Sequence, residues 1–251
     1  MQPPAIDPAA AAAQRVLVWD LPTRLFHWLL AASFLGAYLV SESERWRGVH
    51  ALLGYTAAAL IAFRLLWGVA GTRYARFSGF ALSLRALSGY LKSLVTGAPR
   101  HYVGHNPAGS WAVVALLALV AATAVSGWAV LNAVGPGWLE DLHEACANAT
   151  LALVALHVAA VVVSSFLHRE NLVRAMVTGS KRAAAAAAAA GSRRWVAAAL
   201  LMVLIALWGG WIPAPGLERG TGLAGIPAPT AKLQPEGGRS AHERQRDRHP
   251  D

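Results

Sequence analysis

Histidines inside apolar segments are the residues of this sequence best suited to chemistry. His143 and His157 lie 14 residues apart in one apolar run. On an α-helix this spacing gives about 21 Å of rise and a rotation roughly 40° short of four full turns. Both imidazoles therefore face nearly the same side of one helix, at two depths. Because an ionisable side chain inside a bilayer is costly, the pair indicates a functional site at each depth.

Two further histidines, His27 and His50, stand near the beginnings of two other apolar segments. Runs of about 20 apolar residues are long enough to cross the hydrocarbon of a membrane. We predict spans at residues 23–40, 48–69 and 109–131, a fourth that carries His143 and His157, and a fifth at 195–212. Between the second and third spans, residues 80–94 show the apolar spacing of an amphipathic helix in the membrane interface.

The composition supports a membrane protein. Of the 251 residues, 56% are hydrophobic and 14% are charged, whereas about a quarter of a soluble domain is charged. We therefore expect membrane lipid to surround the helices. The net charge of +9 suits the flanks of spanning helices, and without a nucleic-acid-binding motif we expect no nucleic-acid partner. The single cysteine, Cys146, excludes an internal disulfide, and no C-x-x-C-H sequence exists for covalent haem attachment.

The distribution of Lys and Arg predicts the orientation of the bundle. The connections after the second and fourth spans carry five and six basic residues, and the alternate connections carry two and none. The positive-inside rule then places the N-terminus in the cytoplasm. In this topology His50 and His143 lie near the outer surface, and His27 and His157 lie nearer the cytoplasm. Each level thus receives one histidine from the fourth span and one from another helix.

Two neutral imidazoles from facing helices are a common way to hold a haem iron in a helical bundle. We therefore predict two non-covalent b-type haems, whose irons have His27, His50, His143 and His157 as their ligands. With both axial positions filled, the chemistry is one-electron transfer. Arg24 lies three residues before His27, on the same helix face, and would pair with a haem propionate.

Other interpretations of these residues stay open at this point. A single histidine near a helix end is more often an interfacial anchor than a ligand, and Arg24 would equally extend its charge to the membrane surface. His168 lies near the cytoplasmic edge and competes with His157 for the inner level. We expect His101 and His105 to face water or to contact haem propionates.

The segments around these histidines resemble the bacterial cytochrome b561 family and the b-type cytochrome subunits of nickel–iron hydrogenases. Four segments agree in order and spacing, over roughly residues 15 to 182: VWDLPTRLFHW, RGVHALLGY, RHYVGHNPAGSW and LHEACANATLALVALHVAAVVVSSFLHRENLVRAMVTGSKR. The resemblance implies a bundle of four or five helices with two b haems. Carried over by motif, the ligands are again His27, His50, His143 and His157.

The resemblance also implies a function. Members of the family exchange electrons with membrane quinone and with a redox protein partner such as a c-type cytochrome or a hydrogenase. The expected location is the bacterial inner membrane, which the chain crosses several times. Whether the protein is an electron-transfer cytochrome by itself or the cytochrome subunit of a quinone-linked oxidoreductase stays open.

The predicted fold class is an all-α membrane protein, with a four-helix transmembrane haem-binding bundle and a fifth, C-terminal transmembrane helix. The predicted organisation is a disordered N-terminal lead (1–14), the di-haem domain (15–182), an Ala-rich helical linker (183–194), the fifth helix (195–212) and a disordered tail (213–251).

Two other classes of function compete with this interpretation. A transmembrane metal or proton transporter based on histidines would require carboxylates within the spans as relays, and the first, second, third and fifth spans have none. A structural anchor without a cofactor would leave four histidines in apolar helices unexplained.

Overall fold

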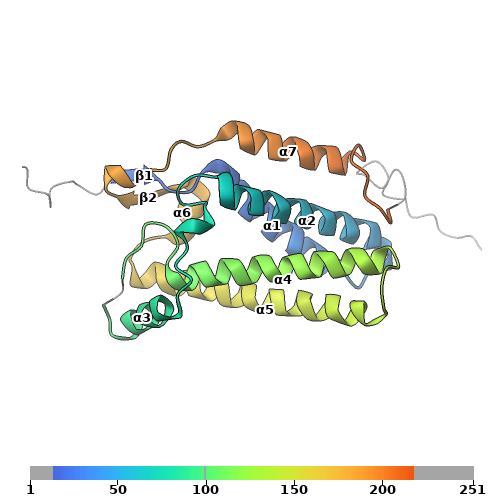
Figure 1. The fold of residues 1–251 in the computed structure, drawn as a ribbon, viewed down its shortest axis with the longest axis horizontal. Helices are drawn as coiled ribbons and strands as arrows, with labels where there is room; N and C mark the ends of the chain where they lie inside the picture. The colour runs from blue at the N-terminus through green and yellow to red at the C-terminus, as the bar shows by residue number, and fades with distance from the viewer. Residues whose placement is uncertain (1–13, 99, 218–251) are drawn as a thin grey trace, which may run out of the picture.

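The computed structural model describes residues 14–98 and 100–217, and most of this part of the chain is helical (Figure 1). The predicted lead over residues 1–14 lies outside the described residues except for Gln14. Of the predicted tail over 213–251, residues 213–217 are described. The expectations of disorder for both ends therefore stay predictions.

Four long helices run side by side along the long axis of the molecule (Figure 1). They are α1 (Leu21–Leu39), α2 (Arg47–Ala70), α4 (Pro107–Leu131) and α5 (Trp138–Leu167). Helix α1 packs on α2, α2 on α4, and α4 on α5. Capping explains two of the starts: the side chain of Asp20 accepts from the Thr23 amide at 2.9 Å, and that of Asn106 accepts from the Gly109 amide at 2.7 Å.

Three helices of the described chain are long and apolar enough to cross a membrane. These are α2 with the preceding 3₁₀ turn η2 (Glu44–Trp46), α4 and α5. Helix α1 and the 15-residue α7 (Arg194–Trp208) are apolar helices that pack beside them. The predicted all-α membrane bundle is thus shown in outline, and a membrane crossing by all five helices stays a prediction.

Helix α7 lies against α1 and α2 (Figure 1). Leu200 and Leu204 of α7 join Phe26, Leu60 and Leu117 in the buried core of the bundle. The Trp208 indole also donates to the Thr56 hydroxyl at 2.9 Å. If α7 crosses the membrane as predicted, such contacts would act through close packing and hydrogen bonding rather than through exclusion of water, because lipid is as apolar as these side chains.

Helix α5 is the least covered of the four long helices. Among its 30 residues only Thr150 is buried. It packs along α4, and no comparable packing joins it to α1 or α2 among the described residues. Side chains bridge the separation instead, as in the 2.8 Å hydrogen bond from the Tyr38 hydroxyl to Asn148 Oδ1. Among the described residues, α5 is therefore held mainly by α4 and by single side-chain contacts to α1 and α2.

A short antiparallel sheet, which the sequence did not predict, lies at one end of the bundle and pairs the segment before α1 with the segment after α6 (Figure 1). Strand β1 (Gln14–Leu17) pairs with β2 (Ser180–Ala183), with Gln14 opposite Ala183 and Leu17 opposite Ser180. The prediction of a helical alanine spacer was wrong, because the run enters β2 and then forms only the 3₁₀ turn η4 (Ala185–Ala187). Alanine favours helix, but so short a run is marginal alone, and the strand pairing decides its conformation.

The connection between α2 and α4 contains the 3₁₀ turn η3 (Phe77–Gly79) and α3 (Leu84–Val95). The predicted amphipathic helix exists, but it begins four residues later than the apolar spacing suggested. Ser83 caps it by accepting from the Ala86 amide at 3.5 Å. Leu84, Leu91 and Val95 are exposed on it, as expected of a helix that rests on the membrane interface. After α5, the short α6 (Leu172–Thr178) leads into β2.

Candidate functional site

The structure brings His50 and His143 together. His50 lies in the first turn of α2 and His143 in the second turn of α5, and their ring centres are 6.0 Å apart with an interplanar angle of 79°. A metal–imidazole bond is about 2 Å long, so two imidazoles on opposite sides of one metal place their ring centres roughly 6 Å apart. The observed separation suits two axial ligands of a single iron.

Both rings of this pair are held through Nδ1. His50 Nδ1 lies 3.0 Å from the carbonyl oxygen of Ala37, and His143 Nδ1 lies 2.8 Å from that of Thr123. A carbonyl can only accept, so these partners assign the proton to Nδ1 and leave Nε2 as an unprotonated ligand atom. Metal-bound histidines are usually oriented in this way. Nothing in the sequence indicated these two carbonyls.

Helix α4, which carries no histidine, also positions His143. A Cβ atom at Gly127 would lie 2.6 Å from His143 Cε1 and 2.9 Å from Nδ1. The hydroxyl of Ser126 lies 3.4 Å from the same nitrogen. The absence of a side chain at Gly127 therefore lets the imidazole lie close against α4, within reach of the Thr123 carbonyl.

The pairing of His27 with His157 at the other level stays a prediction, because no ring contact joins the two among the described residues. His27 packs edge-on against Trp28, with ring centres 4.9 Å apart, and its buried Nδ1 has no hydrogen-bond partner among the described residues. His157 lies near enough for the charges of the two rings to interact. A buried polar nitrogen without a partner is costly, so this site also fits a group that is not part of the chain.

Arg24 lies one turn before His27 and contacts the backbone of α6. One of its terminal nitrogens donates to the Val177 carbonyl, while its buried Nε has no partner among the described residues. Part of the guanidinium is thus committed to the protein and part is still available. Its predicted pairing with a haem propionate stays a prediction.

His105 is more enclosed than the sequence suggested. Its ring packs between Trp19 and Phe80, with ring centres 4.7 Å and 4.8 Å away. Burial lowers the pKa of His105 to about 3, and the charges of Arg64 and Lys181 act in the same direction. The ring is therefore neutral at physiological pH and packs against two aromatic side chains rather than facing water. The other expectation for His105, contact with a haem propionate, stays a prediction.

His168, the alternative inner ligand, caps the C-terminus of α5 and belongs to a polar cluster. Its Nδ1 lies 3.2 Å from His101 Nδ1, and its Nε2 lies 3.4 Å from the Tyr90 hydroxyl. Asn106 Nδ2 donates to the same hydroxyl at 2.9 Å. Burial, followed by the neighbouring His101, lowers the pKa of His168. These contacts commit both ring nitrogens of His168 to the cluster.

A buried carboxylate, Asp20, joins two helices at the end of the bundle where α1 begins and α2 ends. Asp20 is 1% exposed, and besides capping α1 it accepts from Trp67 Nε1 at 3.0 Å and from the Thr72 hydroxyl at 2.7 Å. Arg64, also buried, lies with its guanidinium carbon 4.5 Å from the centre of the Phe77 ring. Asp20 thereby ties the start of α1 to the end of α2, a contact that no sequence pattern indicated.

The arrangement of ligands selects the kind of group that would bind. The described residues contain no cluster of three or more His, Cys, Asp or Glu side chains that would enclose a metal ion directly. Each histidine pair can supply two axial ligands and leaves the other positions to the bound group. A porphyrin provides those four positions in its own plane, so the donor set fits haem.

No curated protein and no solved structure matches the chain. A family model does match: that of prokaryotic cytochrome b561, over residues 18–179. The match includes α1 to α6 and all four histidines of the two pairs. Since it spans well over half of the 251 residues, the chain belongs to the prokaryotic cytochrome b561 family.

Proposed function

We propose that this protein is a di-haem cytochrome that passes electrons between membrane quinone and a redox protein partner, such as a c-type cytochrome or a hydrogenase-like enzyme. Its family makes it a b-type, multi-pass membrane cytochrome of electron transfer. The number of haems, their ligands, the quinone and the partner are the proposal. We place the protein in the bacterial inner membrane with its N-terminus in the cytoplasm, on the charge distribution described above.

One observation carries the proposal: the 6.0 Å separation of the His50 and His143 rings, each fixed through Nδ1 on a backbone carbonyl. These contacts hold both rings through Nδ1 and leave each Nε2 without a protein partner among the described residues, so that both would be available to one shared ligand. Because both imidazoles are held in place by the backbone, His50 and His143 would be the residues that hold a haem, which would supply one-electron redox chemistry.

The second haem would be held by His27 and His157. His143 and His157 both lie on α5, so one helix contributes a ligand at each of two depths. When bound, the haems supply one-electron redox chemistry. The chain contributes the ligands, the spacing along α5 and an apolar surrounding, and we infer that Arg24 pairs with a propionate of the inner group. The alternative of a transporter finds no support in a ligand cluster among the described residues.

Haem content of single variants tests the ligand assignment. The purified protein should contain two haems per chain by pyridine haemochrome assay. His50→Ala and His143→Ala should each lose the same spectral and redox component, and His27→Ala and His157→Ala should each lose the other. His101→Ala, which alters an exposed histidine, is the matched control and should retain both. Retention of both haems with unchanged spectra in His157→Ala would refute the inner pair.

The electron donor is tested separately in membrane vesicles. Addition of a quinol to vesicles that contain the oxidised protein should reduce both haem components. The same measurement on the His50→Ala variant should show reduction of the remaining component alone or none, depending on which haem accepts the electron first. Full reduction by dithionite together with no reduction by any quinol would remove quinone from the proposal and leave the haem assignment intact.

A further inference from the structure

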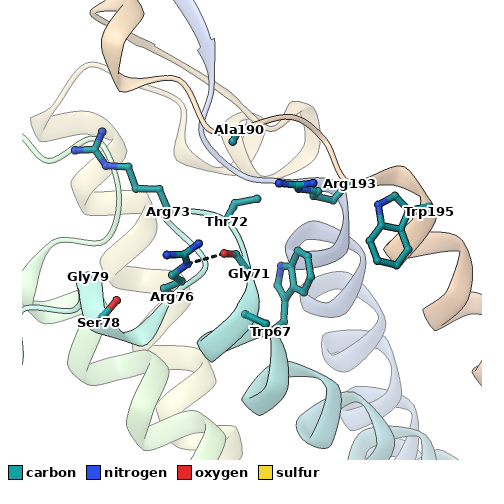
Figure 2. A pocket seen from close by; sticks show the side chains of 11 residues that line it. Trp67, Gly71, Thr72, Arg73, Arg76, Ser78, Gly79, Ala190, Arg193 and Trp195 are labelled. Atoms are coloured by element: carbon teal, nitrogen blue, oxygen red, sulfur yellow. Dashed lines mark hydrogen bonds between the residues drawn. The ribbon is translucent and has the colours of Figure 1, made fainter.

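A cavity of about 610 Å³ opens at the end of the bundle where α2 ends and α7 begins (Figure 2). Its walls come from the last turn of α2, from the loop over residues 71–79 and from the segment that enters α7. Figure 2 shows Trp67, Arg193 and Trp195 on one side of it and Arg73 and Arg76 on the other. The haem-binding histidines are not among its lining residues.

The cavity carries positive charge without a matching carboxylate. Arg73, Arg76 and Arg193 line it, and no Asp or Glu does so. The ion pairs found within the described residues are Arg47–Glu44 and Lys181–Glu170, so none of these three arginines is neutralised by a described carboxylate. An uncompensated group of guanidinium ions favours an anionic ligand, and its planar geometry matches phosphate in particular.

Two of the arginines are held in place by the backbone around them. Arg76 Nε donates to the Gly71 carbonyl at 2.7 Å, a contact drawn in Figure 2, which orients the guanidinium and leaves its terminal nitrogens for a ligand. Arg193 precedes α7 with φ at 50°, a left-handed conformation that costs a non-glycine residue about 1–2 kcal/mol. The conformation is fixed by α7, whose Val196 amide donates to the Arg193 carbonyl at 3.1 Å.

The position of the cavity along the bundle indicates that its anionic ligand is part of a lipid. Trp67 lies in the last turn of α2 and Trp195 in the first turn of α7. Tryptophan at the ends of membrane helices marks the level of the lipid headgroups. Basic pockets between helices at this level are sites for anionic lipid headgroups, and the volume is within the range of small-molecule sites.

We propose that this cavity binds the phosphate headgroup of an anionic phospholipid. Arg73, Arg76 and Arg193 contact the phosphate oxygens, and the two indoles lie against the glycerol and the first part of the acyl chains. Such a lipid would join α7 to the loop after α2, two parts of the chain that are distant in sequence. The proposal does not depend on the number of haems or on the quinone.

The test uses the full-length, haem-loaded protein, stripped of lipid in detergent and then supplied with single lipids. Native mass spectrometry and the temperature of unfolding should show saturable binding of phosphatidylglycerol or cardiolipin and no comparable binding of phosphatidylcholine. Inorganic phosphate at the same concentration should not reproduce the shift. Equal binding of phosphatidylcholine, an equal effect of free phosphate, or displacement of the lipid by a water-soluble quinone would each overturn the proposal.

Charge variants locate the binding. Replacement of Arg73, Arg76 and Arg193 by Gln should weaken anionic-lipid binding at least tenfold. The control replaces Arg85, Arg174 and Arg182 by Gln, which removes the same charge at exposed positions that do not line the cavity. An unchanged haem spectrum shows that each variant is folded. If the triple variant does not fold, Arg193→Gln alone replaces it in the test and should weaken binding of the anionic lipid severalfold. Equal weakening in the control would reduce the effect to net charge and refute the site.

Discussion

Substitution of Gly127 by alanine should weaken one haem site selectively. The new Cβ would lie 2.6 Å from His143 Cε1, whereas carbon atoms in contact are about 3.5–4.0 Å apart, so the ring must withdraw from α4 by about 1 Å. The Nδ1 to Thr123 carbonyl distance, now 2.8 Å, would then approach 3.8 Å, which is too long for a hydrogen bond. Loss of such an orienting contact typically lowers metal affinity 10–100-fold, or about 1.4–2.8 kcal/mol.

The assay is the rate of haem loss to an excess of a haem-scavenging apoprotein, combined with a redox titration of what remains. We expect faster loss of one redox component and no change in the other, because His27 and His157 do not contact Gly127 in the structure. Gly137→Ala is the matched control: it lies at the start of α5, with φ at −59° and nothing within 4 Å of its added Cβ. Unchanged loss rates and potentials for both components in Gly127→Ala would refute the role of α4 in holding His143.

Three further predictions concern the end of the bundle that holds the buried carboxylate and the sheet. Trp67→Phe removes a hydrogen bond to a buried carboxylate and should cost about 1.5–3 kcal/mol in thermal unfolding, whereas Trp211→Phe, at an exposed position, should cost little; equal costs would contradict the contact. The pKa of His105 is about 3 in the folded protein against about 6.5 when unfolded, so the unfolded state binds the extra proton between these values. The free energy of unfolding should therefore fall as the pH drops from 6.5 toward 3, by up to about 1.4 kcal/mol per pH unit. Denaturant titrations across that range should show a weaker dependence of this free energy on pH for His105→Gln than for the unaltered protein. An equal pH dependence in both would contradict the burial of His105. Gly179→Ala and Gly191→Ala both place alanine at positive φ, but only the first brings its Cβ to 2.6 Å from a backbone oxygen, that of Trp19. The Gly179→Ala variant should therefore unfold at a lower temperature than Gly191→Ala. Equal unfolding temperatures would contradict this close approach.

The sequence predicted the helices and the proximity of His50 to His143 better than it predicted the groups that hold these two rings. Apolar runs are a local property, and they were sufficient to place four helices within a few residues. The assignment of the histidines as haem ligands at two levels stays a prediction. The carbonyls of Ala37 and Thr123 are backbone atoms on other helices. No side-chain pattern encodes such partners, because they depend on how closely two helices approach each other.

The errors have a common physical origin in tertiary contacts. The alanine run was expected to be helical on intrinsic propensity, but strand pairing with the residues before α1 takes its first position. His105, which lies in a basic connection, was expected to face water or to contact a haem propionate; the first part was wrong, because Trp19 from the other end of the domain packs against its ring. In both cases the residue that decides the outcome is distant in sequence and carries no periodic signal.

The β1–β2 pairing has a consequence for how the chain can be rearranged. Residues 14–17 and 180–183 are hydrogen-bonded neighbours, so the polypeptide enters and leaves the helical bundle at the same point. Helix α7 therefore follows the four long helices in the chain and packs on α1 and α2 from outside. A foreign helix or a tethered electron carrier could be inserted after residue 183 without a change in the order of the four long helices, provided that it covers the surface where Leu200 and Leu204 now pack.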